Sequence, residues 1–434
     1  MTGPAMHTTR SADVVIVGGG IVGCSTALWL AERGVKVVVL ERGQVASEQS
    51  SRAWGFVRQQ GRHEAEIPLA REANRIWHNL TQRLGAAATE FEVSGILMPA
   101  ETEEDEERVA VGLDDATVNG LDSRRVDAAE IRALVPQMKA DWRCGLYTPG
   151  DAYAEPTIAS RSIAREARNA GAEILEGVAV TSLKTVGDKV VGVRTRDGDV
   201  DADTVLLAAG IGTAHLARGV GLDLPIQMIR SSVGRTTPNV PFTRIAVWGP
   251  KVAYRPRRDG SFVIGNGYRG AGADYDLTIE SLRGLKHFLP AYRRNWRQLK
   301  LSVGAEFVDV LRRATSGEEP VAPLPEPRVN DKKVSGNFQQ FRRLFPHLDG
   351  MALQASWAGR IDLTPDVIPI IDRPDPNQNL FVAAGFSGHG FALGPAVGEQ
   401  MAQWIAEGRS KLDLSAFKAD RFTRGQYDRS KHAL

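Results

Sequence analysis

The chain has 434 residues, more than one typical hydrophobic core accommodates, so we expect two domains. Its 54 lysines and arginines nearly balance its 52 aspartates and glutamates, and the formal net charge of +2 predicts no nucleic-acid partner. The two cysteines, Cys24 and Cys144, are too few for a disulfide framework or a four-ligand zinc site, so we expect no metal and a cytoplasmic location.

The first predicted elements lie in residues 13–42, where an apolar strand, a glycine turn, a helix and a second apolar strand follow one another. This order is typical of a dinucleotide-binding βαβ unit. Gly18 permits the tight turn, Gly20 lets the backbone approach a pyrophosphate, and Gly23 lets the helix pack on the sheet. The free N–H groups at the helix start are expected to face the phosphates. Glu41 ends the second strand, where its carboxylate can accept hydrogen bonds from the ribose hydroxyls of an adenosine.

The same stretch contains an uncharged run, residues 14–31, whose length is near the minimum for a membrane span. Its three consecutive glycines favour the strand, turn and helix interpretation instead. Residues 1–11 carry little positive charge, and no small-residue cleavage site follows the apolar run. We therefore expect neither a transmembrane segment nor a secretory signal.

Further along, helical periodicity predicts helices over residues 71–84 and 157–170, the second ending at Gly171. The acidic run at residues 101–107 heads a polar helix and is typical of a solvated face. Residues 173–210 read as alternating strands joined by Gly-Asp and Asp-Gly turns, ending in an apolar strand.

Residues 224–307 contain longer strands rich in Arg, Tyr and Phe, with helices such as residues 281–287, and predict a mostly antiparallel sheet. Residues 314–335 are rich in proline and charge without periodicity, which predicts a long surface loop. The chain then returns to the first domain and finishes with a strand, a glycine turn and a helix predicted over residues 395–406.

Three signals coincide in this chain: the N-terminal glycine fingerprint, the LLAAG turn ending at Gly210, and the C-terminal pair WAGRIDLTPDVIPIID and GFSGHGFALGPAVGE. With RAWGFVRQQ at residues 52–60, they make residues 13–405 resemble the D-amino-acid oxidase and sarcosine oxidase superfamily of FAD-dependent enzymes. The opine oxidase and dimethylglycine dehydrogenase-like members are the nearest in pattern.

The resemblance implies an α/β fold in which a discontinuous, Rossmann-like FAD-binding domain of the GR2 type adjoins a mostly antiparallel β-sheet substrate domain. FAD would extend through the first domain, with its ring at the boundary and the substrate above the ring. The expected segments are residues 11–85, 145–223 and 350–410 for the FAD-binding domain, 86–144 and 224–349 for the substrate domain, and 411–434 for a C-terminal tail.

The resemblance also implies which residues hold FAD. They are Gly18, Gly20, Ile21, Val22, Gly23, Glu41, Arg42, Ser51, Arg52, Ala53, Trp54, Gly55, Val180, Ala209, Gly210, Gly385, Ser387, Gly388, His389 and Gly390. Members that attach the flavin covalently use a cysteine or a histidine, whereas this chain has Gly359 in the WAG segment and no histidine in residues 51–55, so noncovalent FAD is expected.

Four residues are candidates for binding or transforming the substrate. Arg58 is expected to hold a substrate carboxylate bidentately, against the alternative of a structural arginine. Arg360 is a second anchor, or it packs or forms an ion pair with Asp362 or Asp366. His389 either takes a proton or makes a flavin contact or structural hydrogen bond, and Tyr254 either lines the pocket or packs in the core.

We therefore expect FAD-dependent oxidation of the C–N bond of an amino acid or secondary amine, such as an N-substituted amino acid, an opine-like compound or a D-amino acid. The resemblance implies hydride transfer to flavin N5 and hydrolysis of the resulting imine. Ala392 and Val263 stand where related sarcosine oxidases carry lysines, which leaves oxygen and a quinone or other carrier open as acceptors. An NAD-linked dehydrogenase and a non-catalytic, accessory flavoprotein subunit are the alternatives, and the oligomeric state is open.

Overall fold

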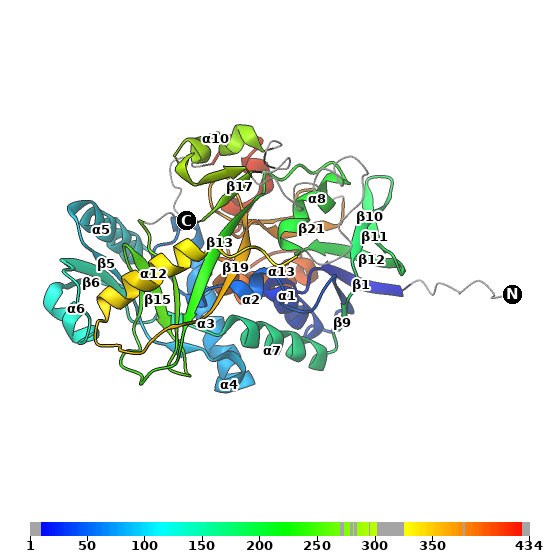
Figure 1. Cartoon of the computed structure of the whole chain (residues 1–434). Coiled ribbons are helices and arrows are strands. Elements are labelled where there is room, and N and C mark those ends of the chain that lie inside the picture. The colour runs from blue at the N-terminus through cyan, green and yellow to red at the C-terminus, as the bar shows by residue number, and fades with distance from the viewer. Residues whose placement is uncertain are drawn as a thin grey trace.

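The computed structural model describes residues 10–269, 273–277, 281, 284–294, 296–301, 325–375 and 378–427. Within these ranges two eight-stranded sheets lie side by side, the first on the right of Figure 1 and the second on the left. The two sheets confirm the expected α/β fold, in which a Rossmann-like part adjoins a mostly antiparallel part.

The first sheet is built around the N-terminal βαβ unit. Its strands, in spatial order, are β10 (Val180–Val186), β11 (Lys189–Thr195), β12 (Gly198–Leu207), β1 (Arg10–Val17), β2 (Val37–Glu41) and β9 (Glu173–Glu176), while β21 (Leu380–Ala384) pairs with β12 and with β20 (Ile370–Asp372). Strand β1 runs parallel to β2, with Val14 beside Val37 and Val17 beside Leu40. Central parallel strands are covered on both faces, which explains the nearly continuous apolar runs of β1 and β2.

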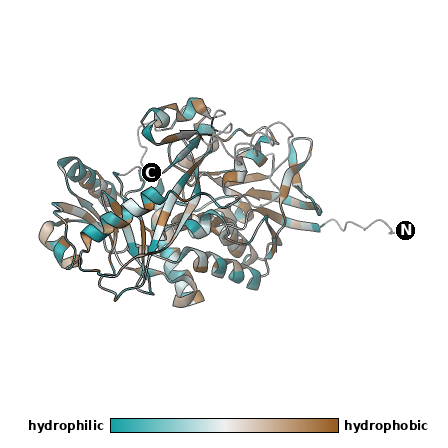
Figure 2. Cartoon of the chain, in the orientation of Figure 1, coloured by the Kyte–Doolittle hydropathy of each residue, from teal (hydrophilic) through white to brown (hydrophobic). Residues whose placement is uncertain are grey.

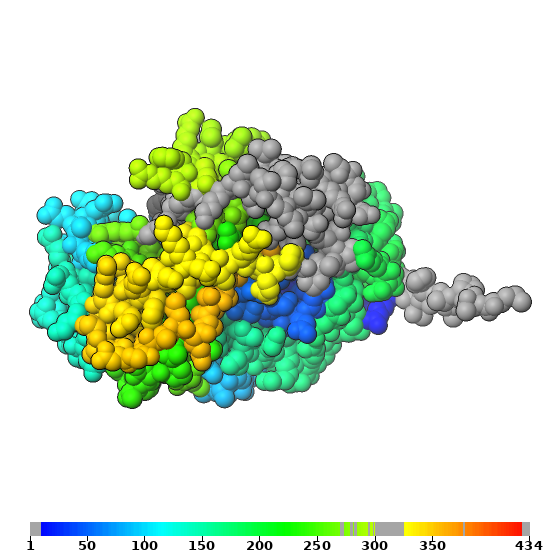
Figure 3. All heavy atoms as spheres, viewed as in Figure 1, coloured from blue at the N-terminus to red at the C-terminus, as the bar shows by residue number. Residues whose placement is uncertain are grey.

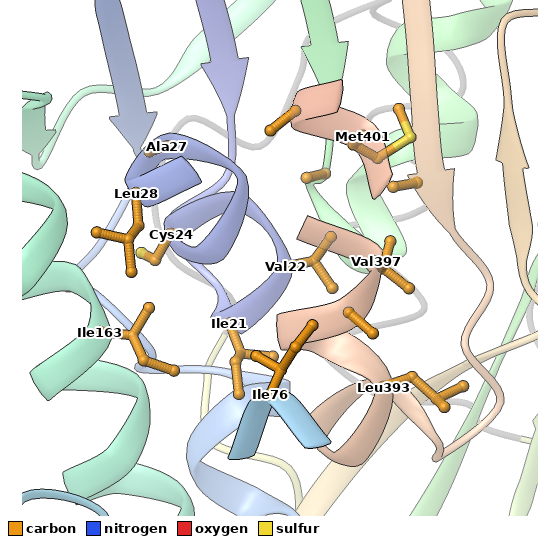
Figure 4. Close-up of a cluster of buried hydrophobic side chains, with 14 of the residues drawn as sticks. Ile21, Val22, Cys24, Ala27, Leu28, Ile76, Ile163, Leu393, Val397 and Met401 are labelled. Carbon is orange, nitrogen blue, oxygen red and sulfur yellow. The ribbon is translucent and has the colours of Figure 1, made fainter. Parts of the chain in front are cut away.

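One face of the first sheet is covered by a layer of helices. They are α1 (Ile21–Ala31), α3 (Ile67–Leu84), α7 (Pro156–Asn169) and α13 (Gly390–Glu407). In Figure 4, Ile21 and Val22 of α1 face Leu393 and Val397 of α13, and Ile76 of α3 lies beside them. This contact brings together the N-terminal parts of two helices that are far apart in the sequence.

Two of these helices begin earlier than their periodicity predicts. Helix α13 begins at Gly390 instead of Pro395, because the last residues of the GHGF segment form its first turn and the proline lies inside the helix. Helix α3 begins at Ile67 instead of residue 71, with Pro68 in the first turn, where the missing N–H group has no helical acceptor.

The second sheet is antiparallel except for one parallel pair, β14 with β5, among the described residues. Its order is β19 (Leu353–Leu363), β13 (Gln227–Thr236), β16 (Phe262–Asn266), β15 (Val252–Pro256), β14 (Ala246–Trp248), β5 (Ile96–Ala100), β7 (Cys144–Thr148) and β6 (Arg124–Asp127). Helix α12 (Asp331–Leu344) packs on it through a cluster of aromatic side chains. Figure 2 shows hydrophobic residues along the strands and mainly hydrophilic residues on α5 (Glu103–Val118).

The smaller elements complete the described structure. They are β3 (Phe56–Val57), β4 (Glu92–Val93), β8 (Ala152–Tyr153), β17 (Tyr275–Leu277), β18 (Leu299–Leu301), α2 (Gln49–Arg52), α4 (Ala86–Thr89), α6 (Ala128–Leu134), α8 (Thr213–Arg218), α10 (Leu285–Arg294), and the 3-10 turns Glu64–Glu66, Gly210–Gly212, Trp296–Gln298, Ser415–Phe417 and Ala419–Arg421. No helix among the residues described is both long and apolar enough to cross a membrane.

Three sequence-based assignments need correction. Strands β7 and β19 belong to the second sheet, although their residues were assigned to the first domain, because β19 pairs with β13 along most of its length. Residues 331–335 begin helix α12 and are not a loop, while residues 314–324 lie outside the described residues. The C-terminal tail expected from residue 411 packs on the protein as far as it is described, since Phe417 and Phe422 are buried against the first sheet. The helix expected over residues 281–287 is interrupted, since Ser281 is helical, Gly284 forms a turn and α10 begins at Leu285. The remaining domain boundaries stay predictions.

Candidate active site

A cavity of about 310 Å³ lies between the two sheets. The first sheet and its helices contribute Glu41 and Val180 to its wall, and the second sheet contributes Trp248 and Asn266. The predicted site residues that line it are Gly18, Gly20, Ile21, Val22, Glu41, Arg42, Arg52, Ala53, Trp54, Gly55, Arg58, Val180, Ala209, Gly210, Arg360, Gly388, His389 and Gly390. The fold thus brings most of the predicted residues, drawn from segments distant in sequence, to one cavity.

Segments far apart in sequence also meet at the surface near this cavity. In Figure 3 the yellow and orange residues of α12 and β19 lie directly beside blue residues of the N-terminal part. The indole Nε1 of Trp357, on β19, donates a hydrogen bond of 3.1 Å to the carbonyl oxygen of Arg52, and the Arg52 guanidinium forms an ion pair with Glu326. These contacts fix α2 against the second sheet.

Tyr254 does not line the cavity and is a correction to the predicted site. Strand β15 alternates its side chains between the two faces of the sheet, and Tyr254 points to the face covered by α12, among Phe262, Phe341 and Phe345. Its hydroxyl group is buried and has no hydrogen-bond partner within the described ranges. Tyr254 is therefore a packing residue.

Gly23 and Ser51 also lie outside the cavity wall. A Cβ atom at Gly23 would be 2.1 Å from the carbonyl oxygen of Gly18, so this glycine is required for close packing of the helix and turn. The Ser51 hydroxyl donates a hydrogen bond to the carbonyl of Glu48, whereas the hydroxyl of the neighbouring Ser50 accepts one of 2.9 Å from the N–H of Ile21. Ser50, not Ser51, therefore faces the start of α1.

Gly385 and Ser387 shape the C-terminal turn from behind the wall. A Cβ atom at Gly385, where φ is +70°, would lie 2.4 Å from Cγ2 of Thr364. The hydroxyl of Ser387 is fully buried and accepts a hydrogen bond from the N–H of Thr364. The turn positions Gly388 and His389 at the cavity without exposing these two residues.

The glycine turn of the N-terminal unit forms a cradle that other side chains would fill. Gly18 has φ of +109°, and a Cβ atom there would lie 2.4 Å from the carbonyl oxygen of Ala208. At Gly20 a Cβ atom would lie 3.1 Å from the hydroxyl oxygen of Ser50, in the space in front of the α1 N-terminus. The first N–H groups of a helix have no acceptors within it, so this space favours an anion.

Glu41 closes the same end of the cavity. Its carboxylate accepts hydrogen bonds of 2.7 Å from the N–H groups of Gly19 and Gly43, and burial raises the pKa of this carboxyl despite the two donors. The next residue, Arg42, forms a bidentate ion pair with Glu48, its Nη2 lying 2.6 Å from Oε1. A cradle, a helix start and a buried carboxylate in this order fit the adenosine and pyrophosphate of FAD.

Gln49 and Asp362 join three separate segments at the cavity wall. Sequence reasoning missed Gln49 and considered Asp362 only as an ion-pair partner of Arg360. The Asp362 carboxylate accepts hydrogen bonds of 2.7 Å from the side-chain amide of Gln49 and from the N–H of Gly385. Burial raises the pKa of Asp362. A Cβ atom at Gly210 would lie 2.2 Å from Oε1 of Gln49, so this network and the AAG turn fit tightly together.

The opposite part of the cavity carries a buried pair, His389 with Glu66. His389 lies immediately before the first residue of α13, and its Nδ1 is 3.0 Å from Oε1 of Glu66. Burial lowers the pKa of His389 to about 4, while the contacts with His389 and Arg62 outweigh burial and lower the pKa of Glu66. The neutral imidazole therefore donates its Nδ1–H to the ionised carboxylate and keeps Nε2 as an acceptor. Of the alternatives for His389, the structure shows a structural hydrogen bond.

Two arginines lie near this pair on the cavity wall. The Arg58 guanidinium stacks over Trp248, 3.8 Å from the ring centroid, and its Nη1 lies 3.4 Å from the carbonyl oxygen of Gln60. Arg62, four residues later, donates from Nε to the carbonyl oxygen of Arg58. Burial, with the neighbouring Arg62 charge, lowers the pKa of Arg58 to about 9, and burial also lowers the pKa of Arg62.

Asp151 is a buried acid next to this arginine pair. Its Oδ1 accepts hydrogen bonds from the backbone N–H of Gln59 at 2.7 Å and from the side-chain amide of Gln59 at 3.3 Å. Burial raises its pKa to about 7, against these donors and the nearby Arg58 and Arg62. Sequence reasoning did not single out Arg62, Glu66 or Asp151, although the spacing of two arginines around Gly61 was a signal for the first.

Comparisons with known proteins agree with this arrangement. Residues 13–404 match the family described as DAO, FAD dependent oxidoreductase. Mitochondrial sarcosine dehydrogenase of Homo sapiens is 23% identical over 440 residues, which cover 97% of this chain but only 42% of that protein, so the chain spans less than half of that relative's length.

Two further proteins match over most of their own length. Sarcosine oxidase subunit beta of Arthrobacter sp is 26% identical over 429 residues, covering 96% of this chain and 92% of that protein. The solved structure of L-amino acid deaminase from Proteus myxofaciens is 23% identical, covers 97% of this chain and 96% of that chain, and has a TM-score of 0.87. Because the family match covers nearly the whole chain, the protein belongs to the family of FAD dependent oxidoreductases.

Proposed function

We propose that the protein uses noncovalently bound FAD to oxidise the C–N bond of an amino acid or secondary amine. The observation that carries this proposal is a single cavity that joins a dinucleotide cradle to two arginines without carboxylate partners among the described residues. The family match favours FAD over the nicotinamide cofactor considered from the sequence. Neither Cys24 nor Cys144 lines the cavity, which supports noncovalent binding.

The residues proposed to hold FAD are those of the cradle and the adjoining walls. Gly18, Gly20 and Glu41 would hold the adenosine and pyrophosphate, and Trp54 and Gly388 would adjoin the ring. Bound FAD supplies the redox chemistry, because it accepts a hydride from the carbon next to a neutral amine nitrogen. The N-terminus of α13 lies on the wall, where its dipole stabilises negative charge.

The chain's own residues would position the substrate. Arg58 would hold the substrate carboxylate, with Trp248 fixing the plane of the guanidinium. The substrate would lose a hydride from carbon and a proton from nitrogen, giving an imine to which water adds, releasing an amine and a carbonyl compound. The electrons would pass on to oxygen or to a quinone-type carrier.

The alternative of an accessory subunit is favoured by one observation, that a relative covering nearly its whole length is a sarcosine oxidase subunit beta. The two functions differ in whether the isolated chain turns over substrate. If the isolated protein binds FAD but no amine reduces it, while addition of a partner subunit restores reduction, the accessory role is supported.

Anaerobic reduction of the purified, FAD-loaded protein tests the proposal. We expect an N-substituted amino acid to bleach the flavin absorbance. Arg58→Gln should retain FAD but need about 10- to 100-fold more substrate for half-maximal reduction, because a charged hydrogen-bond pair to the carboxylate is lost. Arg71→Gln, which removes an exposed charge on α3, should behave as wild type. A colourless protein, or an Arg58→Gln variant reduced like wild type, would contradict the proposal.

A further inference from the structure

The most unusual feature of the cavity is that residues 58–62 present two guanidinium groups on one wall. Arg62 is only 8% exposed, and its Nη1 is buried without a hydrogen-bond partner among the described residues. Within the described ranges, neither Arg58 nor Arg62 has a carboxylate oxygen within 4.0 Å. A buried cation without a carboxylate partner is costly, so the burial of Arg62 beside the half-buried Arg58 requires an explanation.

The local backbone holds both arginines in place. Gly61 has φ of +61°, a conformation that favours glycine, and a Cβ atom there would lie 2.8 Å from Nη1 of Arg58 and 3.1 Å from the ring of Trp248. Arg62 is tied back by its Nε bond to the carbonyl of Arg58. The turn therefore fixes the backbone positions of Arg58 and Arg62, and the bond from Arg62 Nε leaves the Nη1 group of Arg62 as an unused donor.

Two acids lie close enough to influence these arginines, but both are engaged elsewhere. Glu66 uses Oε1 for His389, and Asp151 uses Oδ1 for Gln59, while the second oxygen of each carboxylate is buried and has no partner in the part of the chain that the structure describes. The acids thus lower the cost of the two positive charges without forming ion pairs with them. Arg58 uses Nη1 for the carbonyl of Gln60 and Arg62 uses Nε for the carbonyl of Arg58, so the Nη1 group of Arg62 is the donor left for another acceptor.

We propose that the substrate carries two carboxylate groups, one bound by Arg58 and the other by Arg62. This inference rests on the proposed function and narrows its substrate class to N-(carboxyalkyl) amino acids and acidic amino acids. Arg58 would hold the carboxylate next to the oxidised carbon, and Arg62 the carboxylate on the nitrogen substituent or side chain. Arg62 is then a specificity-determining residue, because a substrate with one carboxylate leaves its Nη1 without a partner.

Matched pairs of ligands test the proposal in the FAD-loaded protein. Sarcosine and iminodiacetate differ by one carboxylate on the nitrogen substituent and serve as substrates for anaerobic flavin reduction. (Methylthio)acetate and thiodiacetate differ in the same way, but sulfur replaces the oxidisable nitrogen, so their dissociation constants come from changes in the flavin spectrum or from calorimetry. We expect the diacid to bind about 10- to 100-fold more tightly than the monoacid.

Variants assign that preference to one residue. Arg62→Gln should weaken binding of the diacid far more than binding of the monoacid and so reduce the preference for the diacid to about twofold or less, and Arg62→Lys should retain part of that preference because charge remains without the planar fork. Arg71→Gln is the control for loss of a positive charge at an exposed position of α3. FAD content and melting temperature show whether each variant is folded. If Arg62→Gln does not fold, the binding of the monoacid and the diacid by the wild type and by Arg62→Lys tests the proposal.

The outcomes separate this inference from the proposed function. Equal binding of monoacid and diacid by the wild type, or equal weakening of both by Arg62→Gln, overturns the diacid proposal even where sarcosine reduces the flavin. Tight, Arg62-dependent binding of thiodiacetate without flavin reduction by any amine overturns the proposed oxidation and leaves the diacid site standing.

Discussion

Asp151 links the chemistry of the cavity to the stability of the protein. It is fully buried, and its pKa is raised to about 7 from an ordinary value of 3.8. Between these two values the unfolded chain carries an ionised Asp151, whereas the folded protein keeps the proton. The folded state therefore binds more protons, and its stability falls as the pH rises through this window.

The variant Asp151→Asn removes this titration. The free energy of unfolding of the wild type should fall relative to that of the variant by about 1 kcal/mol or more between pH 5 and pH 8. Urea unfolding of the FAD-loaded proteins at both pH values measures the difference. The lowered pKa of His389 acts in the opposite direction, with stability lost as the pH falls below about 6.5, but it is common to both proteins. Asp114→Asn, on the exposed face of α5, is the control, and parallel pH profiles for Asp151→Asn and wild type would contradict the prediction.

The residue scale also shows where sequence reasoning was sufficient and where it was not. Glu41 could be placed because its role depends on a local pattern of strand, turn and helix. Glu66 and Asp151 carry no local signal, since their hydrogen-bond partners His389 and Gln59 come from other segments that only the fold brings together. Tyr254 was misplaced because successive side chains of a strand point to opposite faces of the sheet. The sequence of the strand does not show which face is covered by helix α12.

At the scale of elements, the contact between α1 and α13 is the one that sets the site. Gly394 and Gly398 are one turn apart on α13, and Cβ atoms there would lie 2.7 Å from Cγ2 of Ile21 and 2.4 Å from Cβ of Ser25. The two glycines let the helix axes approach closely, as the interdigitated side chains in Figure 4 show. Because both helices begin at the cavity, their separation controls its shape.

Gly398→Ala should therefore force the two helices apart. Overpacking of this kind costs about 1–3 kcal/mol, and we expect weaker FAD binding together with a lower free energy of unfolding. Gly336→Ala is a matched control on α12, where a Cβ atom would meet nothing within 4 Å, and it should raise stability by up to about 1 kcal/mol. Chemical denaturation and FAD titration measure both effects. If both substitutions changed the free energy of unfolding in the same direction, close packing of α1 on α13 would not be the reason for the glycine at position 398.

The same scale explains which elements were predictable. The βαβ unit of residues 13–42 is local, so its strands, turn and helix follow from periodicity and glycine spacing. The start of α13 was placed too late because Pro395 looked like a helix start, whereas the tight turn before it already begins the helix. Strand β19 was assigned to the wrong sheet because its partner, β13, lies more than a hundred residues away in the sequence.

At the scale of the whole molecule, the C-terminal segment, residues 411–427, stabilises the stretch of chain that connects the second sheet to the first. Beyond β19 the chain passes through Asp366 on its way to the first sheet. Arg421 donates from Nε to Asp366 Oδ2 at 2.7 Å and from Nη2 to Oδ1 at 3.1 Å, and Nη2 also donates to the carbonyl of Ile368. Both side chains are buried, so this bidentate pair stabilises the crossing only while both members are present.

Arg421→Met should leave the Asp366 carboxylate buried and unpaired, at a cost of about 3–5 kcal/mol in the free energy of unfolding. Adding Asp366→Asn should recover part of that loss, because the uncompensated charge is removed. Arg424→Met removes an exposed arginine three residues away, paired only with Asp420 in the described structure, and should cost less than about 1 kcal/mol. Urea unfolding ranks the four proteins, and protease cleavage within residues 411–427 reports release of the C-terminal segment. The prediction would be contradicted if Arg421→Met were as stable as wild type, or if the double variant were less stable than Arg421→Met. Either result would show that the ion pair of Arg421 with Asp366 does not stabilise the connection between the two sheets.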